Sequence, residues 1–196
     1  MPMTSEKAKF MKSATLLIDT REQENKHITS KLSELGVAIE SRKLDFGDYS
    51  FCNAGRDFSG LCVVERKANV LELYNNMTEH KTDKNGAWID VGERIQKELD
   101  AANRTGAQLV LMLEDCGSSD ELREYVMPEW QRRACPNLKT YDIGRVVYQN
   151  LKSWQTSNRY GFRVEYVKDK QNSAARILEE FYYWYRNYKL AVSARR

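Results

Sequence analysis

Histidine and cysteine are scarce in this sequence, with two and four residues among 196. The four cysteines (Cys52, Cys62, Cys116 and Cys135) include no C-x-x-C pair, and only His27 and His80 could join them as ligands. A structural zinc site usually takes four such side chains in closely spaced pairs, so the sequence argues against one. We expect reduced thiols with a structural role.

Long apolar runs are also missing. No stretch approaches the roughly 18 to 20 apolar residues that a membrane-spanning helix needs, and residues 1–13 lack the apolar core of a signal peptide. We therefore expect no membrane association and an intracellular, cytoplasmic protein, associated with the nucleoid or nucleus if it acts on a genome.

Proline is rare and the charges nearly balance. Three prolines, 41% hydrophobic and 30% charged residues are typical of a globular chain without extended disorder. We expect a mobile basic leader over 1–13, a single domain over 14–190 and a tail over 191–196. The net charge of +3 permits a polyanionic partner without identifying one.

Apolar periodicity predicts an α/β fold with a mixed central sheet flanked by helices. The order is β-α-β-β-β-α-β-α-β-α, with the two helices between 67 and 108 taken as one helical segment. We expect the strands at 37–44, 48–52 and 61–67 to form an antiparallel meander, 108–113 to be an interior parallel strand and 162–166 an edge strand. The remaining predicted elements are a strand at 14–18 and helices at about 26–35, 69–77, 91–102, 142–154 and 172–188.

Several local signals refine these elements. Gly36 is placed to end the first helix in a left-handed conformation, and Asn69 and Asp142 can cap the helices that follow them. We expect a flexible polar break over 78–86. Residues 114–141 are predicted as an elaborated loop that can hold one short helix.

Charged clusters stand at the ends of three predicted strands: Asp19-x-Arg21-Glu22, Gly47-Asp48 and Glu65-Arg66-Lys67. On a strand, Glu65 and Lys67 point to one side and Arg66 to the other. Carboxylates that converge on one rim repel each other unless a cation lies between them. Oxygen ligands without histidine or cysteine favour Mg²⁺ or Mn²⁺ over zinc. The sequence thus favours metal-dependent phosphodiester hydrolysis, although Glu65 and Lys67 alone could be a surface ion pair.

The three motifs, in this order, resemble the nuclease domain of the XPF-type structure-specific endonucleases, a branch of the PD-(D/E)xK superfamily with a restriction-endonuclease-like fold. The resemblance covers roughly residues 14–185. It implies a Mg²⁺- or Mn²⁺-dependent DNA endonuclease that acts on branched, flapped or single/double-strand junction DNA, in repair or recombination, and leaves 5′-phosphate ends.

The resemblance also implies roles for single residues. Asp48 and Glu65 would hold the metal with the main-chain carbonyl of Arg66, Asp19 would assist, and Lys67 would serve the attacking water. Arg21 and Arg66 would grip phosphate or brace the acids, Glu22 would support that network, and Arg94 would touch the DNA backbone. For Arg21, an ion pair with Glu22 or Glu65 is the alternative to a phosphate contact.

The sequence departs from the family pattern at Leu71, where the family has an aspartate; Glu72 stands beside it. Family members that act on forks usually carry a helix-hairpin-helix module after the nuclease, and this sequence ends at Arg196. These departures leave open a catalytically reduced scaffold that binds DNA or a partner, or a nuclease for plain duplex, single strands or RNA.

The predicted C-terminal helix is rich in aromatic residues. Its rings could stack on unpaired bases, but core packing combined with a subunit interface fits a helix better, and we expect a homodimer or a heteromeric partner there. The rings concerned are Phe181, Tyr182, Tyr183, Trp184, Tyr185 and Tyr188.

Overall fold

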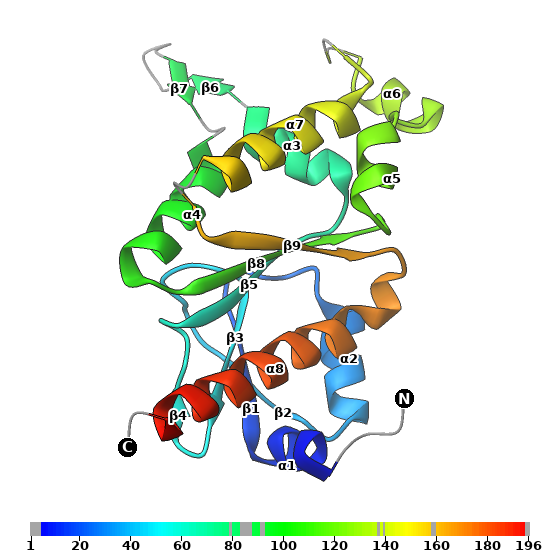
Figure 1. The fold of residues 1–196 in the computed structure, drawn as a ribbon. Coiled ribbons are helices and arrows are strands. Elements are labelled where there is room, and N and C mark those ends of the chain that lie inside the picture. The colour runs from blue at the N-terminus through cyan, green and yellow to red at the C-terminus, as the bar shows by residue number, and fades with distance from the viewer. Residues whose placement is uncertain are drawn as a thin grey trace.

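The computed structural model describes residues 5–78, 80–82, 88–90, 93–136, 138, 140–157 and 160–194. Its elements follow one another as Figure 1 shows. The strands are β1 (Ala14–Ile18), β2 (Ala38–Ser41), β3 (Tyr49–Asn53), β4 (Arg56–Asp57), β5 (Cys62–Lys67), β6 (His80–Thr82), β7 (Trp88–Asp90), β8 (Gln108–Glu114) and β9 (Phe162–Val167). The helices are α1 (Ser5–Ser13), α2 (Lys26–Glu34), α3 (Val70–Thr78), α4 (Glu93–Thr105), α5 (Ser119–Glu124), α6 (Glu129–Ala134), α7 (Ile143–Thr156), the short 3-10 helix η1 (Lys170–Asn172) and α8 (Ser173–Ser193).

The central sheet has the strand order β2-β1-β3-β5-β8-β9, with β4 paired to β3. Strand β3 runs antiparallel to both β1 and β5, whereas β8 runs parallel to both β5 and β9. The pairing therefore changes from antiparallel to parallel at β5, and it changes again at β1, which is parallel to β2. The mixed α/β sheet that the sequence predicts is confirmed, as are the interior position of β8 and the edge position of β9.

The predicted antiparallel meander is wrong in its first strand. Strand β2 does not pair with β3; it lies at the edge of the sheet and pairs in parallel with β1, Thr15 opposite Ala38. The turn after β2 ends in Gly47, and β3 enters the sheet on the far side of β1. All four residues of β2 are exposed, as suits an edge strand.

The expected mobile leader is also wrong for Ser5–Ser13, which form helix α1. Lys9 and Lys12 are exposed, Lys7 forms an ion pair with Glu179 of α8, and Phe10 and Met11 are buried. The Phe10 ring lies 5.6 Å from that of Phe51 and 5.8 Å from that of Tyr182, between ring centroids. These aromatic contacts fasten α1 to β3 and α8.

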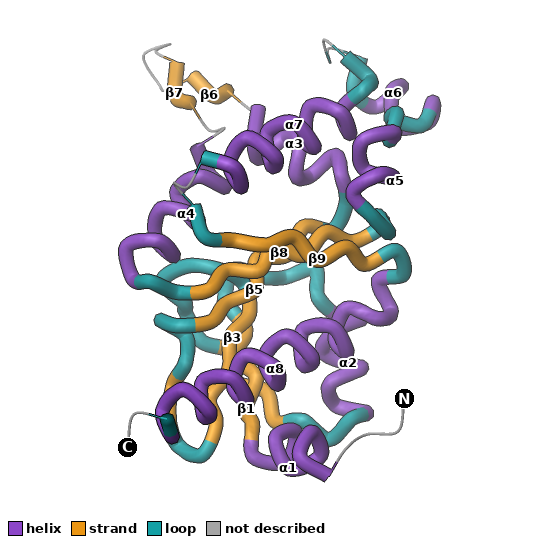
Figure 2. The backbone as a smooth tube through the Cα atoms, viewed as in Figure 1, coloured by secondary structure: helices purple, strands orange, loops and turns teal. Residues whose placement is uncertain are grey.

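Helices cover both faces of the sheet (Figure 2). One core lies between the sheet and helices α1, α2 and α8; the other lies under α3, α4, α5 and α7. Along β5 the side chains alternate between them, with Cys62 and Val64 in the first core and Val63 in the second. The same alternation divides the charged residues that follow.

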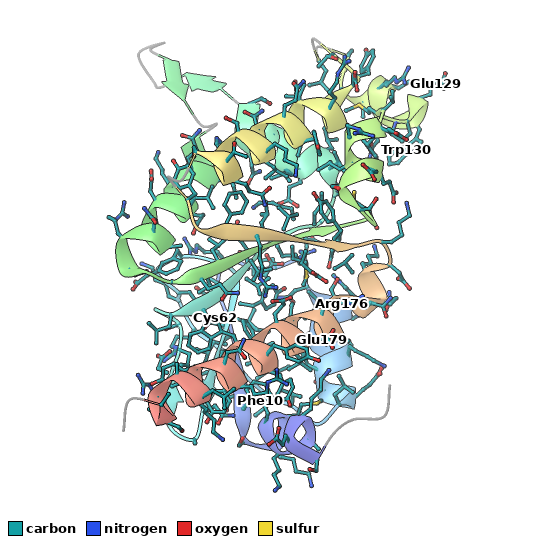
Figure 3. The ribbon with its side chains drawn as sticks, viewed as in Figure 1. Phe10, Cys62, Glu129, Trp130, Arg176 and Glu179 are labelled. Carbon is teal, nitrogen blue, oxygen red and sulfur yellow. The ribbon has the colours of Figure 1, made fainter. Side chains whose placement is uncertain are left out.

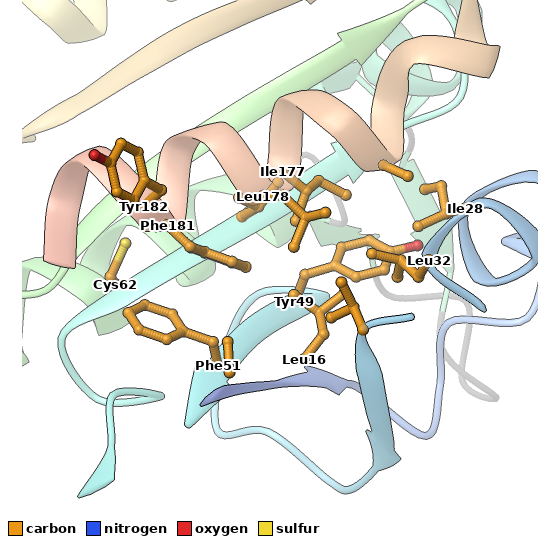
Figure 4. Packing of buried hydrophobic residues seen from close by; sticks show 14 of the residues in the cluster. Leu16, Ile28, Leu32, Tyr49, Phe51, Cys62, Ile177, Leu178, Phe181 and Tyr182 are labelled. Atoms are coloured by element: carbon orange, nitrogen blue, oxygen red, sulfur yellow. The ribbon is translucent and has the colours of Figure 1, made fainter. Parts of the chain in front are cut away.

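Figure 4 shows how α8 fills the first core. Ile177, Leu178 and Phe181 point at β1, β3 and α2, and the Phe181 ring lies 4.9 Å from that of Phe51. Trp184, Tyr185 and Tyr188 also pack against this core. The aromatic surface of α8 is therefore largely used within the chain, as core packing requires.

The segments predicted as irregular contain more structure than expected. Two short helices, α5 and α6, lie in the predicted loop 114–141, and Glu129 and Trp130 of α6 project away from the sheet (Figure 3). Residues 79 and 83–86 of the predicted polar break lie outside the described residues, but β6 and β7 on either side pair with each other. The four cysteines are free thiols.

No helix in the described part of the chain is long and apolar enough to cross a membrane.

Two of the three predicted helix-end signals are confirmed. Gly36 has a φ of +69° at the end of α2, and the Asn69 side chain accepts the Glu72 N–H at 2.9 Å. Asp142 precedes α7, but its side chain makes no capping hydrogen bond.

Candidate active site

The ends of β1, β3 and β5 meet at one edge of the sheet. Ile18 pairs with Tyr49, and Tyr49 with Val64, so the next residues, Asp19, Asp48 and Glu65, are neighbours across the three strands. The Asp19 N–H donates to the Asp48 carbonyl at 2.8 Å, and the Asp48 N–H to the Val64 carbonyl at 2.9 Å. Because Ile18, Tyr49 and Val64 face the first core, the three acids face the opposite side, toward α3 and α4.

Lys67 lies within this group of acids. Its Nζ is 2.6 Å from Glu65 Oε1, and each residue is only 2% exposed. Burial by itself would lower the pKa of Lys67, but the negative charges of Glu65 and Asp48 raise it above its usual value. Lys67 is therefore a buried ammonium group that can stabilise negative charge and has no free electron pair to act as a base.

Asp48 is the acid whose charge is least compensated. Its Oδ2 accepts the Arg66 N–H at 2.7 Å. Burial and the nearby Glu65 raise its pKa well above the usual range, although Lys67 opposes the shift. The site therefore holds more carboxylate charge than its own cations neutralise.

Asp19, by contrast, is fully engaged by its neighbours. Its Oδ1 accepts from Arg21 Nε at 2.7 Å and from the Arg21 N–H at 2.8 Å, and its Oδ2 accepts from Arg21 Nη2 at 3.0 Å and from the Leu44 N–H at 2.7 Å. Burial raises the pKa of Asp19, yet these hydrogen bonds outweigh it and lower the pKa below the usual value. The Arg21 side chain is 57% exposed and pairs with Asp19, and neither Glu22 nor Glu65 is its partner.

Arg66 points to the opposite side of the sheet, as the strand alternation predicts. Its guanidinium group is buried and binds Glu22 Oε1 at 2.8 Å, the Glu24 carbonyl at 2.9 Å and Glu114 Oε2 at 2.7 Å. The guanidinium group therefore lies on the face away from Lys67, and it ties the end of β5 to Glu22 and Glu114. A contact of Arg66 with phosphate stays a prediction.

Glu114 is the residue of this network that sequence reasoning missed. Its Oε1 also contacts His27 Nε2 at 2.8 Å and the Ser173 hydroxyl at 2.5 Å. The signal was present, since Glu114 follows the apolar run 108–113 just as Asp19 and Glu65 follow theirs. The prediction closed that strand one residue too early.

Glu98 is a second acid that the sequence analysis did not identify, and it approaches the site from helix α4. Its Oε2 accepts the Gly47 N–H at 2.9 Å. Burial and then the charge of Glu65 raise its pKa, while the Gly47 hydrogen bond, Arg21 and Lys67 act in the opposite direction. Glu98 thus lies in the electrostatic field of the same group of acids. The amphipathic pattern of its helix gave no sign of this.

Leu71 and Arg94 are the two remaining positions that the sequence singled out. Leu71 packs against the second core, and Glu72 beside it accepts the Ala68 N–H at 2.7 Å and lies 3.9 Å from Lys67 Nζ. A carboxylate therefore stands near Lys67 even though Leu71 is not one. Arg94 belongs to the first turn of α4, but its side chain lies outside the described part of the structure.

The arrangement fits a hard divalent cation with few protein ligands. In the part of the chain that the structure describes, no three His, Cys, Asp or Glu side chains are grouped closely enough to form a complete metal site. Asp48 and Glu65 are the carboxylates that end up side by side at the strand ends, and Mg²⁺ binds through one or two carboxylates while it keeps several waters. The excess negative charge at Asp48 is what such an ion would neutralise.

Gly47 fixes the distance between these strands. Its φ is +72°, and a Cβ atom placed on it would lie 2.9 Å from Val63 Cβ. Both the left-handed backbone and the close approach to β5 require glycine. The residue that carries Asp48 into the site is therefore held against the strand that carries Glu65.

Comparisons with known proteins agree with this geometry. The model of the ERCC4 domain family matches residues 18–180. Among solved structures, XPF from Aeropyrum pernix is similar, with a TM-score of 0.56, 18% identity and coverage of 91% of this chain and 69% of that one. XPF from Aeropyrum pernix in complex with DNA has a TM-score of 0.56, 19% identity and coverage of 88% and 65%. No curated protein matches. The chain thus spans about two thirds of the structures whose fold it shares.

Proposed function

The chain belongs to the ERCC4 domain family, and on this premise we propose that it is a Mg²⁺- or Mn²⁺-dependent DNA endonuclease that cuts branched or single/double-strand junction DNA. The observation that supports the proposal best is the convergence of Asp48, Glu65 and Lys67 on one face at the ends of adjacent strands. Their charges, burial and oxygen donors fit phosphodiester hydrolysis assisted by a divalent metal.

The residues divide the work by their charge. A bound divalent cation would polarise the scissile phosphate and supply a hydroxide-like nucleophile near neutral pH. Asp48, Glu65 and the Arg66 carbonyl would bind it. Lys67, held by Glu65 at 2.6 Å, would donate hydrogen bonds to the attacking water and to the phosphate oxygens as their charge grows. Arg66, Glu22 and Glu114 would keep the end of β5 in place from the other face.

The exposed Arg21 is the residue best placed to touch a phosphate. Its guanidinium group is already oriented by Asp19 through two hydrogen bonds, and a pre-oriented guanidinium loses little freedom when it binds. Asp19 then acts through Arg21, and its direct contact with the metal stays a prediction. The contact of Arg94 with the DNA backbone likewise stays a prediction. One of the similar structures is a complex with DNA, which supports the choice of substrate.

The predicted homodimer or heteromeric partner at the C-terminal helix also stays a prediction. Most of the aromatic rings of α8 pack within the chain, and its exposed large apolar residues are Tyr183 and Leu190. Sedimentation at high micromolar concentration tests this part, because a monomer there would remove it.

The decisive experiment incubates the protein with labelled forks, flaps, bubbles, duplex and single strands in Mg²⁺, Mn²⁺ or chelator. We expect cleavage of junction substrates in metal only, with 5′-phosphate products identified by mass. Asp48→Ala and Glu65→Ala should abolish cleavage, and Lys67→Ala should slow it by about 10²–10³-fold, while DNA binding persists. Lys31→Ala, in an exposed ion pair on α2, is the matched control.

The outcomes separate the alternatives. Full activity of Lys67→Ala, or cleavage in chelator, would refute the assigned site. DNA binding without cleavage of any substrate by the wild type would identify a scaffold. Cleavage of plain duplex, single strands or RNA in preference to junctions would keep the site and change the substrate.

A further inference from the structure

The cluster at the strand ends has an excess of negative charge that the described cations do not match. Arg21 neutralises Asp19 through a paired contact, and Lys67 neutralises Glu65. Once these two pairs are formed, the carboxylates of Asp48 and Glu98 remain on the same face, together with the partly exposed Glu72, which lies 3.9 Å from Lys67 Nζ. The remaining negative charge is what a divalent cation at this site would neutralise.

Glu98 comes from a different element than the other acids. Asp48 and Glu65 project from the sheet, whereas Glu98 belongs to α4. Its Oε2 accepts a hydrogen bond of 2.9 Å from the Gly47 N–H, in the loop before β3. Gly47 immediately precedes Asp48, so Glu98 is hydrogen-bonded to the residue next to Asp48 in the chain. Because the hydrogen bond uses Oε2, the carboxylate keeps a second oxygen with its own lone pairs.

The absence of a three-carboxylate group in the described residues determines what Glu98 can do. Glu98 does not form such a group with Asp48 and Glu65, so a direct role for all three on one ion is not what the structure offers. Mg²⁺ dehydrates reluctantly and keeps several waters when two carboxylates bind it, and such waters need acceptors. Outer ligands of this kind typically change metal affinity by about 10- to 100-fold.

We propose that Glu98 is the outer acidic ligand of this site: it accepts hydrogen bonds from the hydration waters of a divalent cation held by Asp48 and Glu65, and thereby positions the ion under α4. This inference rests on the proposed metal-dependent function and adds a residue that the family motifs do not include. It makes Glu98 a positioning residue, which acts through the hydrated ion. The bond to Gly47 couples that position to the turn that carries Asp48.

Glu98→Gln tests the inference because glutamine keeps the carbonyl oxygen that can accept the Gly47 N–H and removes only the charge. The matched control is Asp100→Asn, which makes the same chemical change two residues along the same helix, on its other side. Binding of Mn²⁺ alone is measured by titration calorimetry and by electron paramagnetic resonance of the free ion, without DNA. Thermal unfolding in chelator and in Mn²⁺ gives a second readout.

We expect Glu98→Gln to bind Mn²⁺ about ten-fold more weakly than the wild type, and Asp100→Asn to bind it as the wild type does. In chelator, Glu98→Gln should melt no lower than the wild type, because it relieves repulsion by Glu65, and its stabilisation by Mn²⁺ should be smaller. Equal Mn²⁺ affinity of Glu98→Gln and the wild type would overturn the inference while the proposed function stands. No Mn²⁺ binding by the wild type would instead refute the proposed function. A lower melting temperature of Glu98→Gln in chelator, with unchanged affinity, would reduce Glu98 to a structural anchor for Gly47.

Discussion

Replacing Gly47 by alanine tests how the loop before β3 is held against β5. An L-residue at a φ of +72° costs about 1–2 kcal/mol. The new methyl group would also lie 2.9 Å from Val63 Cβ and 3.2 Å from Val63 Cγ2, and such overpacking of a buried strand costs about 1–3 kcal/mol. The sum, about 2–5 kcal/mol, is a large part of the 5–15 kcal/mol that folded domains typically have.

Gly36 provides the matched control. Its φ is +69°, but a Cβ atom there meets nothing within 4 Å. Gly36→Ala therefore carries only the backbone cost, and the entropy that alanine removes from the unfolded chain is common to both variants. The difference between the two variants isolates the close contact with Val63.

Urea unfolding followed by circular dichroism measures both free energies of unfolding. With a slope of about 2 kcal/mol per molar urea, the contact alone should lower the midpoint of Gly47→Ala below that of Gly36→Ala by about 0.5–1.5 M. Equal midpoints for the two variants would refute the reasoning, because the backbone cost would then account for the whole effect.

Three further predictions concern the buried charges and the cores. Arg66→Met should lower the free energy of unfolding in urea by about 3–5 kcal/mol, because it leaves buried carboxylates unpaired; Arg123→Met, in an exposed ion pair, should change it by less than about 1 kcal/mol. The pKa of Asp48 is raised in the folded chain, so between the usual carboxyl pKa near 3.8 and that raised pKa the folded chain binds a proton that the unfolded chain has released. In chelator, the melting temperature should therefore fall as the pH rises through this range. Thermal melts of Asp48→Asn should lack this decline. Phe51→Ala, in the first core, should lower the free energy of unfolding in urea by about 3–5 kcal/mol. Trp130 is 71% exposed, so Trp130→Ala should lower it by about 0.5 kcal/mol or less. Similar losses for the two variants would contradict the assigned core.

The acids and Lys67 of the proposed site could be located from the sequence because they stand directly at the ends of apolar runs. Cys62–Val64 are buried and continuous in the chain, so the strand and its charged end are visible without knowledge of the fold. The alternation that separates Lys67 from Arg66 is a property of any strand, and the structure places the two side chains on opposite faces. At these positions the residue types and their spacing along one strand were enough to predict the site.

Strand pairing and contacts between distant segments could not be predicted from the sequence in the same way. The position of β2 depends on which strand edge is open to it, and four residues with no buried side chain carry no information about that choice. Helix α1 was missed because the ring partners of Phe10 lie far away in the sequence, on β3 and α8. Glu98 meets Gly47 across 51 positions, and nothing in the pattern of either segment indicates the contact.

The network around Arg66 bears on the kinetics of folding. Its partners come from the loop after β1 and from the end of β8, and through Glu114 it extends to His27 on α2 and Ser173 on α8. The contacts close loops of 42 to 87 residues, so no local fragment of the chain can compensate the guanidinium charge. Folding dominated by such distant pairings is slow compared with that of helical bundles. We expect the end of β5 to be among the last parts of the sheet to become ordered, so that the chain acquires the geometry of the proposed site only once both layers of helices have docked.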